Sequence, residues 1–394
     1  MQVYSPRNRH TTKSLAGFGC KRKSLFAKWV KGIFLLAFLM LLGGLLFLKF
    51  NLSAAAIFTD NVLRPLLGDA NVIAIERIFF NASDGIQRLT SNQNSIKAPQ
   101  FEDSGGLNNV SGSNLDLSPI PKLNNFEDVQ NEGIWRDWPL KAFPDKEVMA
   151  YTFVRSDPER AYSITTLVQL DMSVLGIGSV AGIKQPAGPI GKPGPGKVPK
   201  EIVDSGNLVA AFDGGFQYKD GQYGMIVGDK TYLPLKNDLG TFIAYKDGTL
   251  KIVDYQGQEL GGNINFIRQN CPMLISNGEI TVTNPRSRIL WGRLAAGTVD
   301  IYTYRSGIGL TKKGNLIFAA GNNLTPNTLA IALKSAGAVN AIQLDINPIW
   351  VRFNIFDQFS QGKYVSTPLT KELHDGTDGY LNGYDKDFFY VYKK

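Results

Sequence analysis

The sequence predicts an α+β fold, in which a strand-rich, mixed-sheet domain with a few helices stands behind one N-terminal transmembrane helix. Three observations lead to this expectation: an uncharged apolar run near the N-terminus, β-rich runs separated by turn residues from about residue 145 onward, and one well-marked helix late in the chain. A hydrophobic content of 43% and 41 glycines are typical of a globular protein rich in turns and strands. The 394 residues suffice for a sizeable core.

The net charge of +8 originates at the N-terminus. Residues 1–31 contain eight Lys and Arg and no acidic residue, which leaves 34 cations and 34 acids in the rest of the chain. Nucleic-acid binding needs a basic face on a folded domain. We therefore exclude nucleic acid as a partner and interpret residues 1–31 as a basic cytoplasmic tail.

Residues 32–48 (GIFLLAFLMLLGGLLFL) carry no charge and are predicted to be a transmembrane signal anchor. A helix of this length covers roughly 25 Å, slightly less than a 30 Å hydrocarbon core. A cleaved signal peptide is the alternative, since small residues follow at 53–56, but the basic and apolar regions are longer than such peptides usually have. The preceding cations predict a single-pass protein with its N-terminus in the cytoplasm and its C-terminal domain extracytoplasmic.

Residues 49–133 are predicted to be a juxtamembrane stalk and flexible linker. Residues 51–90 mix apolar and polar side chains and suggest a partly helical stalk, whereas residues 91–133 are dominated by Ser, Asn, Gly, Asp and Pro without periodicity. Such a composition buries too little apolar surface to hold one conformation. Packing is expected to resume at residue 134, so that 134–394 form the folded domain.

Strand-like runs in this domain are joined by recognisable turns. Asp247-Gly248 is a strong hairpin signal, and Lys313-Gly314-Asn315 marks a second hairpin. The strands expected from these patterns are Val148–Val154, Ile164–Leu170, Leu208–Phe212, Thr241–Tyr245, Leu250–Tyr255, Tyr302–Leu310 and Leu316–Ala320. Residues 182–200 form a Gly/Pro/Lys loop, which is either a mobile excursion between strands or a lid over a site.

One helix is predicted over residues 326–336. Thr325 is a suitable N-cap, Pro326 occupies the first helical position and Gly337 ends the helix. The following apolar run, Ala338–Leu344, is typical of a buried strand and ends at Asp345.

The scarcity of His and Cys limits the chemistry. The only histidines are His10 and His374, and the only cysteines are Cys20 and Cys271. Cys20 is either a reduced thiol or a palmitoylation site, and His374 lies in a polar segment typical of an exposed loop. The folded part therefore offers no Cys/His metal site, and no metal or other cofactor is expected. Catalysis would depend mainly on carboxylates, Arg or Lys, hydroxyls and backbone amides.

Three segments place charged side chains and glycines at strand ends. They are Asp213-Gly214-Gly215-Phe216 after an apolar strand, Arg305-Ser306-Gly307-Ile308-Gly309, and Leu344-Asp345-Ile346-Asn347. Bare backbone at paired glycines lets a ligand approach amide donors, and an arginine facing a cleft can bind phosphate through two hydrogen bonds. Taken singly, each has an ordinary alternative: an Asp-Gly turn, a surface ion pair and an Asx turn.

In this order, and with the capped helix between the second and third, these segments resemble the phosphodiester glycosidase family. Two further segments support the resemblance, which extends from about residue 148 to 355: Cys271–Gly278 and Gly307–Leu316. Two departures stand out. The family's Asn-Gly-Gly-Phe-Phe begins here with Asp213 and ends with Gln217, and the family's Leu-Asp-Gly-Gly-Gly-Ser is replaced by 344–349 (LDINPI).

The resemblance implies hydrolysis of the bond between a sugar's anomeric carbon and a phosphate oxygen. It implies that Asp213 and Asp345 supply a base or nucleophile and an orienting partner, and that Arg305 binds the phosphate. Substrate-binding roles would fall to Gly214, Gly215, Phe216 and Asn347. Whether the anomeric configuration is retained or inverted stays open, because it depends on the carboxylate separation.

The sequence thus predicts a membrane-anchored extracytoplasmic glycosidase whose partner is a phosphorylated glycan or glycolipid of the cell envelope or an exopolysaccharide. The alternative is a non-catalytic glycan-phosphate-binding protein that retains the fold, which the altered segment after Asp345 favours. A purely structural cell-envelope domain has no positive signal, and the oligomeric state is unknown.

Overall fold

The computed structural model describes residues 58–91, 96–101, 113–282, 291, 302–360, 363–371, 373 and 379–394. The predicted anchor 32–48, Cys20 and His374 lie outside these residues. Within the described part of the chain, no helix is long and apolar enough to cross a membrane. The chain divides into two compact units, Met1–Leu66 and Leu67–Lys394. In the first, residues Thr59–Leu63 form a π-helix, η2, followed by α3 (Arg64–Leu67) across the division.

The second unit contains three β-sheets. The largest has eight strands in the order β1-β2-β3-β14-β13-β15-β11-β12. Its strands are β1 (Arg136–Asp137), β2 (Met149–Val154), β3 (Thr165–Leu170), β11 (Met273–Ser276), β12 (Glu279–Ile280), β13 (Thr303–Thr311), β14 (Leu316–Leu324) and β15 (Ala338–Ile346). This sheet carries two of the three predicted site segments, on neighbouring strands β13 and β15.

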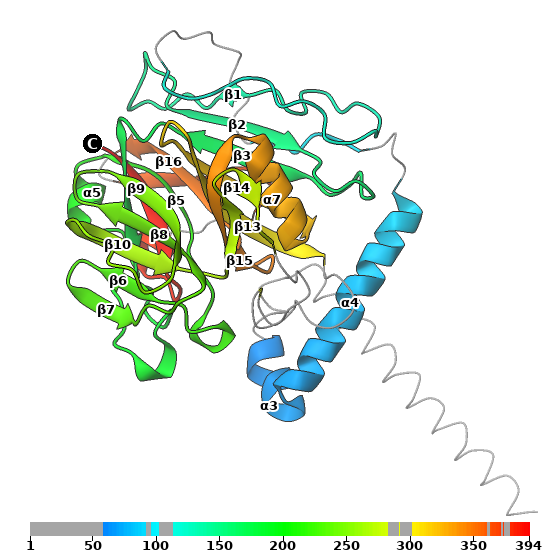
Figure 1. Cartoon of the computed structure of the whole chain (residues 1–394), viewed down its shortest axis with the longest axis horizontal. Helices are drawn as coiled ribbons and strands as arrows, with labels where there is room; N and C mark the ends of the chain where they lie inside the picture. The colour runs from blue at the N-terminus through cyan, green and yellow to red at the C-terminus, as the bar shows by residue number, and fades with distance from the viewer. Residues whose placement is uncertain are drawn as a thin grey trace, which may run out of the picture. The chain divides into compact units, whose positions relative to one another are not determined.

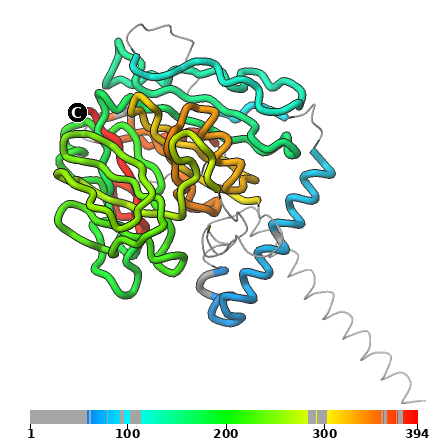
Figure 2. The backbone as a smooth tube through the Cα atoms, in the orientation of Figure 1, coloured from blue at the N-terminus to red at the C-terminus, as the bar shows by residue number. Residues whose placement is uncertain are grey.

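The other two sheets have five strands each, in the orders β7-β6-β10-β8-β9 and β17-β16-β5-β18-β4. Their strands are β4 (Leu175–Val180), β5 (Leu208–Asp213), β6 (Met225–Val227), β7 (Lys230–Leu233), β8 (Leu239–Tyr245), β9 (Leu250–Tyr255), β10 (Ile264–Gln269), β16 (Phe353–Ser360), β17 (Lys363–Pro368) and β18 (Phe388–Lys393). Figure 2 shows the red C-terminal strand running among green segments, because β18 pairs with both β4 and β5.

Helices are few. They are α4 (Asp69–Thr90), α5 (Lys200–Asp204), α7 (Pro326–Ser335), α8 (Gly379–Asn382) and the 3-10 turns η4 (Gly188–Ile190) and η5 (Tyr218–Asp220). Helix α7 begins as predicted: the Thr325 hydroxyl accepts from the backbone N–H of Thr328, whose own hydroxyl accepts from the Thr325 N–H. In Figure 1 this orange helix lies against β13 and β14, which it contacts together with β15.

Two apolar cores lie on opposite faces of the central strands. Along β14, Phe318 and Ala320 belong to one core, whereas Ile317 and Ala319 belong to the other. This alternation is the period of two expected of a strand buried on both faces. The first core includes Phe212 and Phe353 of the β5–β16 sheet, and the second includes Leu329 and Leu333 of α7. The face of the strand to which a side chain points therefore decides which of the two cores it packs into.

The strand-rich fold with few helices is confirmed. The seven predicted strands and the helix are present, with bounds that shift by a few residues. The sequence predicted a mixed sheet. Among the described residues, the neighbouring strands within each sheet pair antiparallel.

The expectation of a flexible linker is corrected for residues 113–133. Leu115 and Ile120 are buried, and Asp116 exchanges two hydrogen bonds with the side chain of Gln169 in β3. Few apolar residues suffice here because they add to an existing sheet instead of forming a core alone. The predicted stalk contains helix α4, whose Asp84 forms a buried ion pair with Arg160 at 2.8 Å. The domain boundary at residue 134 stays a prediction.

The Gly/Pro/Lys loop 182–200 is held in place by backbone hydrogen bonds. Ile183 and Gly196 bond to Tyr384, and Val198 donates to the carbonyl of Tyr380. The loop also borders a cavity of about 390 Å³ with β4 and β7. The loop, whose composition suggested a mobile connection between strands, is thus hydrogen-bonded to residues 380–385. Its role as a lid stays a prediction.

Candidate functional site

Two of the predicted site carboxyls, Asp213 and Asp345, are linked through one hydroxyl. The Ser306 Oγ donates to Asp213 Oδ2 at 2.5 Å and accepts from the backbone N–H of Asp345 at 3.0 Å. All three residues are buried. Asp213 ends β5 in one sheet, while Ser306 and Asp345 belong to β13 and β15 in another. The cluster therefore joins two sheets through residues far apart in sequence.

A β-bulge brings Asp345 to this cluster. Arg305 pairs with Ile346 and Gly307 pairs with Gln343, so that Leu344 and Asp345 together stand opposite Ser306. An extra residue in one strand bends it and re-aims the neighbouring side chain. The bulge explains how Asp345 meets Ser306 even though Gln343, two residues earlier, contacts the other face.

Lys386 completes the cluster and was not foreseen. Its Nζ forms a buried ion pair with Asp345 Oδ2, while Asp345 Oδ1 accepts from the N–H of Ile346. On the other side of the cluster, the backbone N–H of Arg352 donates to Asp213 Oδ1 at 2.9 Å. Asp345 is thus matched to a cation, whereas Asp213 receives only a hydroxyl and an amide. These different surroundings separate the two carboxyls chemically.

Burial and charge shift the pKa values of this cluster. Burial raises the pKa of Asp213 to about 7, although hydrogen bonds from Ser306 and Arg352 and the charge of Lys386 oppose the shift. Burial likewise lowers the pKa of Lys386 to about 8, against the opposing effect of Asp387 and Asp213. A carboxyl that still holds its proton near neutral pH can act as a general acid.

Arg305, the predicted phosphate ligand, does not join the hydrogen bonds of this cluster. It is buried and donates from Nε to the carbonyl of Leu324 at 2.8 Å and from Nη1 to Gln343 Oε1 at 3.0 Å. Consecutive residues of a strand point to opposite faces, and Ser306 next to it contacts Asp213. The Leu324 that it bonds belongs to the core packed on α7. Its role in binding phosphate stays a prediction that these contacts do not favour.

The interpretation of Gly214 and Gly215 as ligand donors is corrected. The Gly214 N–H donates to the Asp387 carbonyl and the Gly215 N–H donates to Asp387 Oδ2. A Cβ on Gly214 would lie 2.1 Å from Asp387 Oδ2, and one on Gly215 would lie 2.4 Å from Arg268 Nη2. Because the two glycines have no side chain, the buried Arg268–Asp387 ion pair can pack directly against their backbone.

The two other predicted substrate contacts have structural partners. Phe216 is buried, and its N–H donates to Asn270 Oδ1 at 3.0 Å. Asn347 has a φ of 97° and accepts from the Ile349 N–H through its side chain, which is the Asx turn considered from the sequence. Their substrate-binding roles stay predictions.

Arg268, Asp387, Lys386 and Arg352 escaped the sequence analysis. A weak signal existed for the first two, because a lone cation within the apolar run of β10 and a charged pair before β18 indicate buried partners. Lys386 and Arg352 follow no motif, and only the packing of β16 and β18 beside β5 brings them to Asp213.

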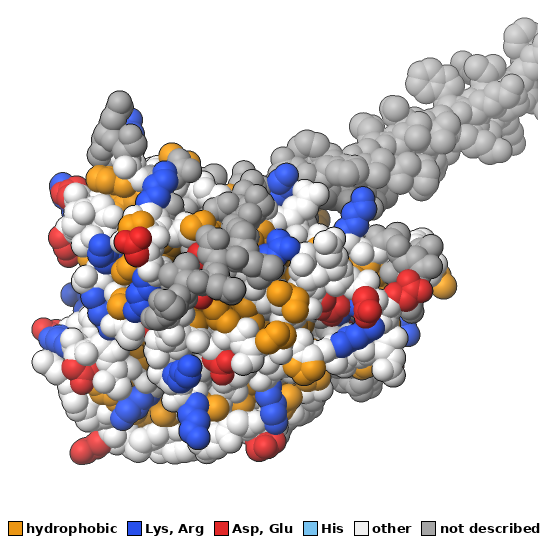
Figure 3. Space-filling model, turned by 90° about the horizontal axis from the view of Figure 1, so that it is seen from above, with side chains coloured by type: hydrophobic (Ala, Val, Ile, Leu, Met, Phe, Trp, Pro, Cys, Tyr) orange, Lys and Arg blue, Asp and Glu red, His pale blue; other side chains and the backbone are white. Residues whose placement is uncertain are grey.

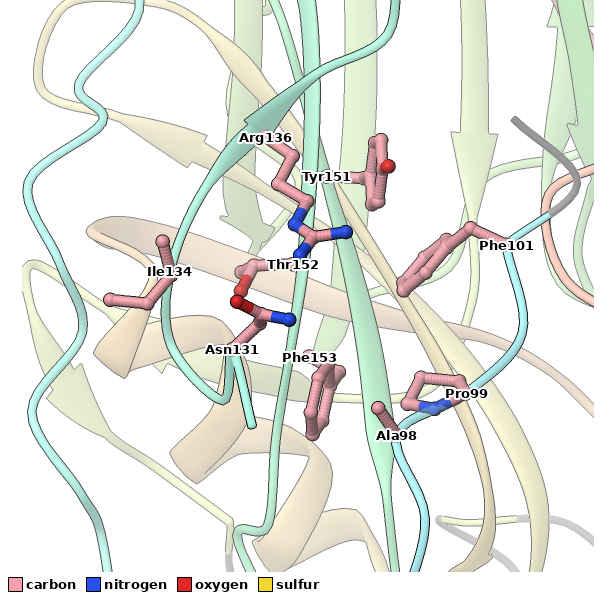
Figure 4. A pocket seen from close by; sticks show the side chains of 9 residues that line it. All are labelled: Ala98, Pro99, Phe101, Asn131, Ile134, Arg136, Tyr151, Thr152 and Phe153. Carbon is pink, nitrogen blue, oxygen red and sulfur yellow. The ribbon is translucent and has the colours of Figure 1, made fainter. Parts of the chain in front are cut away.

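Besides the cavity at the 182–200 loop, two smaller cavities lie outside this cluster. One of about 290 Å³ lies beside β13 and β14 and is lined by residues including Tyr304, Thr166 and Asn322. Another, of about 40 Å³, lies at β1 and β2 (Figure 4), where the Arg136 guanidinium points toward the space bordered by Phe101 and Tyr151. Among the described residues, the Arg136 side chain has no hydrogen-bond or ion-pair partner.

The electrostatic character of the surface agrees with a charge-balanced domain. On the face drawn in Figure 3, Lys and Arg side chains are interspersed with Asp and Glu, and neither sign forms a continuous field. In the part of the chain that the structure describes, no group of three or more His, Cys, Asp or Glu is arranged to hold a metal ion.

One protein-family model matches the central part of the chain. Residues 206–345 match the model of the phosphodiester glycosidase family, which confirms the resemblance found in the sequence. This range contains Asp213, Ser306 and Asp345, but ends before Arg352 and Lys386. No curated protein matches the chain.

Solved structures provide distant likenesses. The catalytic domain of zebrafish N-acetylglucosamine-1-phosphodiester alpha-N-acetylglucosaminidase, auto-inhibited by its pro-peptide, is 15% identical, with a TM-score of 0.39 over 66% of this chain and 88% of that one. A hypothetical protein from Synechocystis is 12% identical, with a TM-score of 0.33 over 63% of each chain. At these scores neither likeness establishes a shared activity.

Proposed function

We propose, from the phosphodiester glycosidase match of residues 206–345, that this chain hydrolyses the sugar–phosphate bond of a glycosyl-1-phosphodiester. The family match supports a hydrolase acting on glycosyl bonds. The observation that carries the finer proposal is the linkage of Asp213 and Asp345 through Ser306, because it joins the three motif segments in one buried cluster.

The two carboxyls have surroundings suited to different tasks. Lys386 favours the ionised form of Asp345, which fits a base or nucleophile. The raised pKa of Asp213 fits a group that donates a proton to the leaving oxygen. In the reaction the C1–O bond breaks, the phosphate oxygen keeps the electron pair, and water supplies a hydroxyl to C1 and a proton to the products.

The substrate is proposed to be a phosphorylated glycan of the cell envelope or an exopolysaccharide. The predicted anchor at 32–48, with its basic flank, would hold the protein at the membrane with the domain on the extracytoplasmic side. The cavity of about 290 Å³ is near the lower limit of ligand pockets, and its lining includes Tyr304, which precedes Ser306 by two residues on β13.

Full-length protein in detergent, incubated with nitrophenyl phosphodiesters of several sugars, tests the proposal. Hydrolysis releases nitrophenyl phosphate, which an added phosphatase converts to a coloured product. Asp213→Asn and Asp345→Asn should each lower kcat/KM at least a hundredfold. Asp229→Asn, which changes an exposed carboxyl between β6 and β7, is the matched control. Absence of turnover with every sugar would overturn the catalytic proposal.

A non-catalytic glycan-phosphate-binding protein is the second candidate. It is favoured by the segment after Asp345, where the family's glycines are replaced and Asn347 forms an Asx turn. Binding of the same phosphodiesters without turnover, unchanged in Asp345→Asn, would select this candidate.

A further inference from the structure

Arg352 is a buried cation without a counter-ion among the residues that the structure describes. Only 8% of its surface is exposed. Its Nε donates to the Ile349 carbonyl at 3.0 Å, whereas among the described residues its two terminal nitrogens have no hydrogen-bond or ion-pair partner. An isolated buried charge is costly, and buried charges are ordinarily paired. The missing partner is a reason to look for an anionic ligand.

The ring of Tyr384 packs against this guanidinium, and the ring of Tyr380 packs against that of Tyr384. The central carbon of the guanidinium is 5.4 Å from the ring centre of Tyr384, which packs edge-on against Tyr380 at 4.9 Å. The hydroxyls of both tyrosines are buried without a hydrogen-bond partner. Burial raises the pKa of both phenols, and the charges of Arg352 and Asp213 act on them in opposite directions. Three adjacent groups thus have unused donors.

The surrounding charges leave one positive charge to be matched. Lys386 is paired with Asp345, and Arg268 is paired with Asp387. Asp213 accepts from the backbone of Arg352, not from its guanidinium, and is neutral when it holds its proton. A phosphodiester carries a single negative charge, and an arginine can bind two of its oxygens in parallel. The single positive charge and the chemistry of the unused donors therefore suit this group.

The cluster also reaches the surface. Lys386 Nζ lies 4.8 Å from the ring centre of Trp350, which is partly exposed and packs edge-on near Tyr384 at 6.4 Å. Trp350 and Arg352 follow directly on the segment that replaces the family's glycines. In this chain the Asx turn at Asn347 precedes both residues, and the backbone N–H of Arg352 donates to Asp213.

We propose that Arg352, with the hydroxyl of Tyr384, binds the phosphate of the substrate in this chain, in the role that the sequence had suggested for Arg305. The inference rests on the proposed function, because it assigns the phosphate of the same substrate. It concerns residues outside the matched range 206–345.

Calorimetric titration of the full-length protein with α-glucose 1-phosphate, inorganic phosphate and glucose tests this assignment. Arg352→Gln should weaken binding of both phosphates at least tenfold, and Tyr384→Phe several-fold. Arg136→Gln, which alters another arginine without a partner, should change it less than twofold. Equal phosphate affinity in Arg352→Gln and the parent protein would overturn the proposal.

Stability measurements separate ligand binding from a structural role. Without phosphate, Arg352→Met should keep or raise the urea midpoint, because a buried unpaired charge is removed, while phosphate should raise the midpoint of the parent protein only. A lower midpoint in Arg352→Met, together with phosphate stabilisation that persists, would show that Arg352 is structural. Arg352→Lys, which retains the charge, should bind phosphate with intermediate affinity.

The two proposals fail in different ways. Arg352-dependent phosphate binding without turnover of any phosphodiester would overturn the proposed hydrolysis and leave this assignment intact. Turnover with the same KM in Arg352→Gln as in the parent protein would overturn the assignment and leave the hydrolysis intact.

Discussion

Replacement of Arg268 by methionine is expected to destabilise the protein by about 3 to 5 kcal/mol. Arg268 and Asp387 both have fully buried side chains, and the guanidinium donates to the carboxylate at 2.8 Å and 3.2 Å. Methionine retains the apolar stem but removes the charge. Asp387 then keeps the Gly215 amide as a donor and loses its cation.

The magnitude follows from what the change leaves unpaired. A buried carboxylate deprived of its partner accounts for about 3 to 5 kcal/mol. Arg268 also donates to the carbonyls of Gln269 at 2.7 Å and of Tyr223 and Phe216 at 3.1 Å. These three bonds are lost together with the ion pair, and a buried acceptor left unsatisfied is costly, so we expect the upper part of the range.

Urea denaturation followed by tryptophan fluorescence measures the effect. Lys184→Met is the matched control, because Lys184 pairs with Asp385 at 2.7 Å but the two side chains are 69% and 48% exposed. An exposed pair contributes about 0 to 1 kcal/mol. If Arg268→Met lost no more stability than Lys184→Met, the argument from burial would be wrong.

Three further predictions concern the cluster and its supports. The free energy of unfolding should fall as pH rises from about 4 to 7, because Asp213, with a pKa of about 7, binds its proton more tightly in the folded state than in the unfolded state. Urea titrations at several pH values should show that Asp213→Asn removes this slope, and an unchanged slope would contradict the pKa shift. Gly215→Ala should lower the urea midpoint, because the new Cβ would lie 2.4 Å from Arg268. Gly85→Ala in α4, where a Cβ would meet no atom within 4 Å, should raise the midpoint, and equal shifts in the two variants would refute the steric argument. Thr325→Ala should cost about 1 kcal/mol through loss of the capping box of α7, while Thr325→Ser should cost less, and a neutral Thr325→Ala would exclude a stabilising cap.

Local patterns predicted the elements well wherever the determinants lie close together in sequence. Asp247-Gly248 produced the β8–β9 hairpin, and Thr325, Pro326 and Gly337 delimited α7. The prediction of a flexible linker did not hold for 113–133. This segment is stabilised by contacts with β3, and the composition of the segment alone does not reveal such contacts.

The candidate site was predicted in part. Asp213 and Asp345 lie in one cluster, as the order of the motifs implied. They are linked by Ser306, to which the sequence had assigned no role, and not by its neighbour Arg305. The bulge opposite Ser306 could not be foreseen, because it depends on the register between β13 and β15. Reading Gly214 and Gly215 as ligand donors overlooked Asp387, which is 172 residues away and takes the Gly215 amide.

The sequence by itself determined the strand-rich fold, the capped helix and the two carboxyls at strand ends, because these follow from periodicity, turn chemistry and spacing along the chain. The tertiary structure alone decided which cations accompany them. Lys386 reaches Asp345 and Arg352 reaches Asp213 only because β16 and β18 pair beside β5. Burial among those strands then sets the pKa of Asp213, since the energy of a charge depends on what surrounds it and not on its place in the chain.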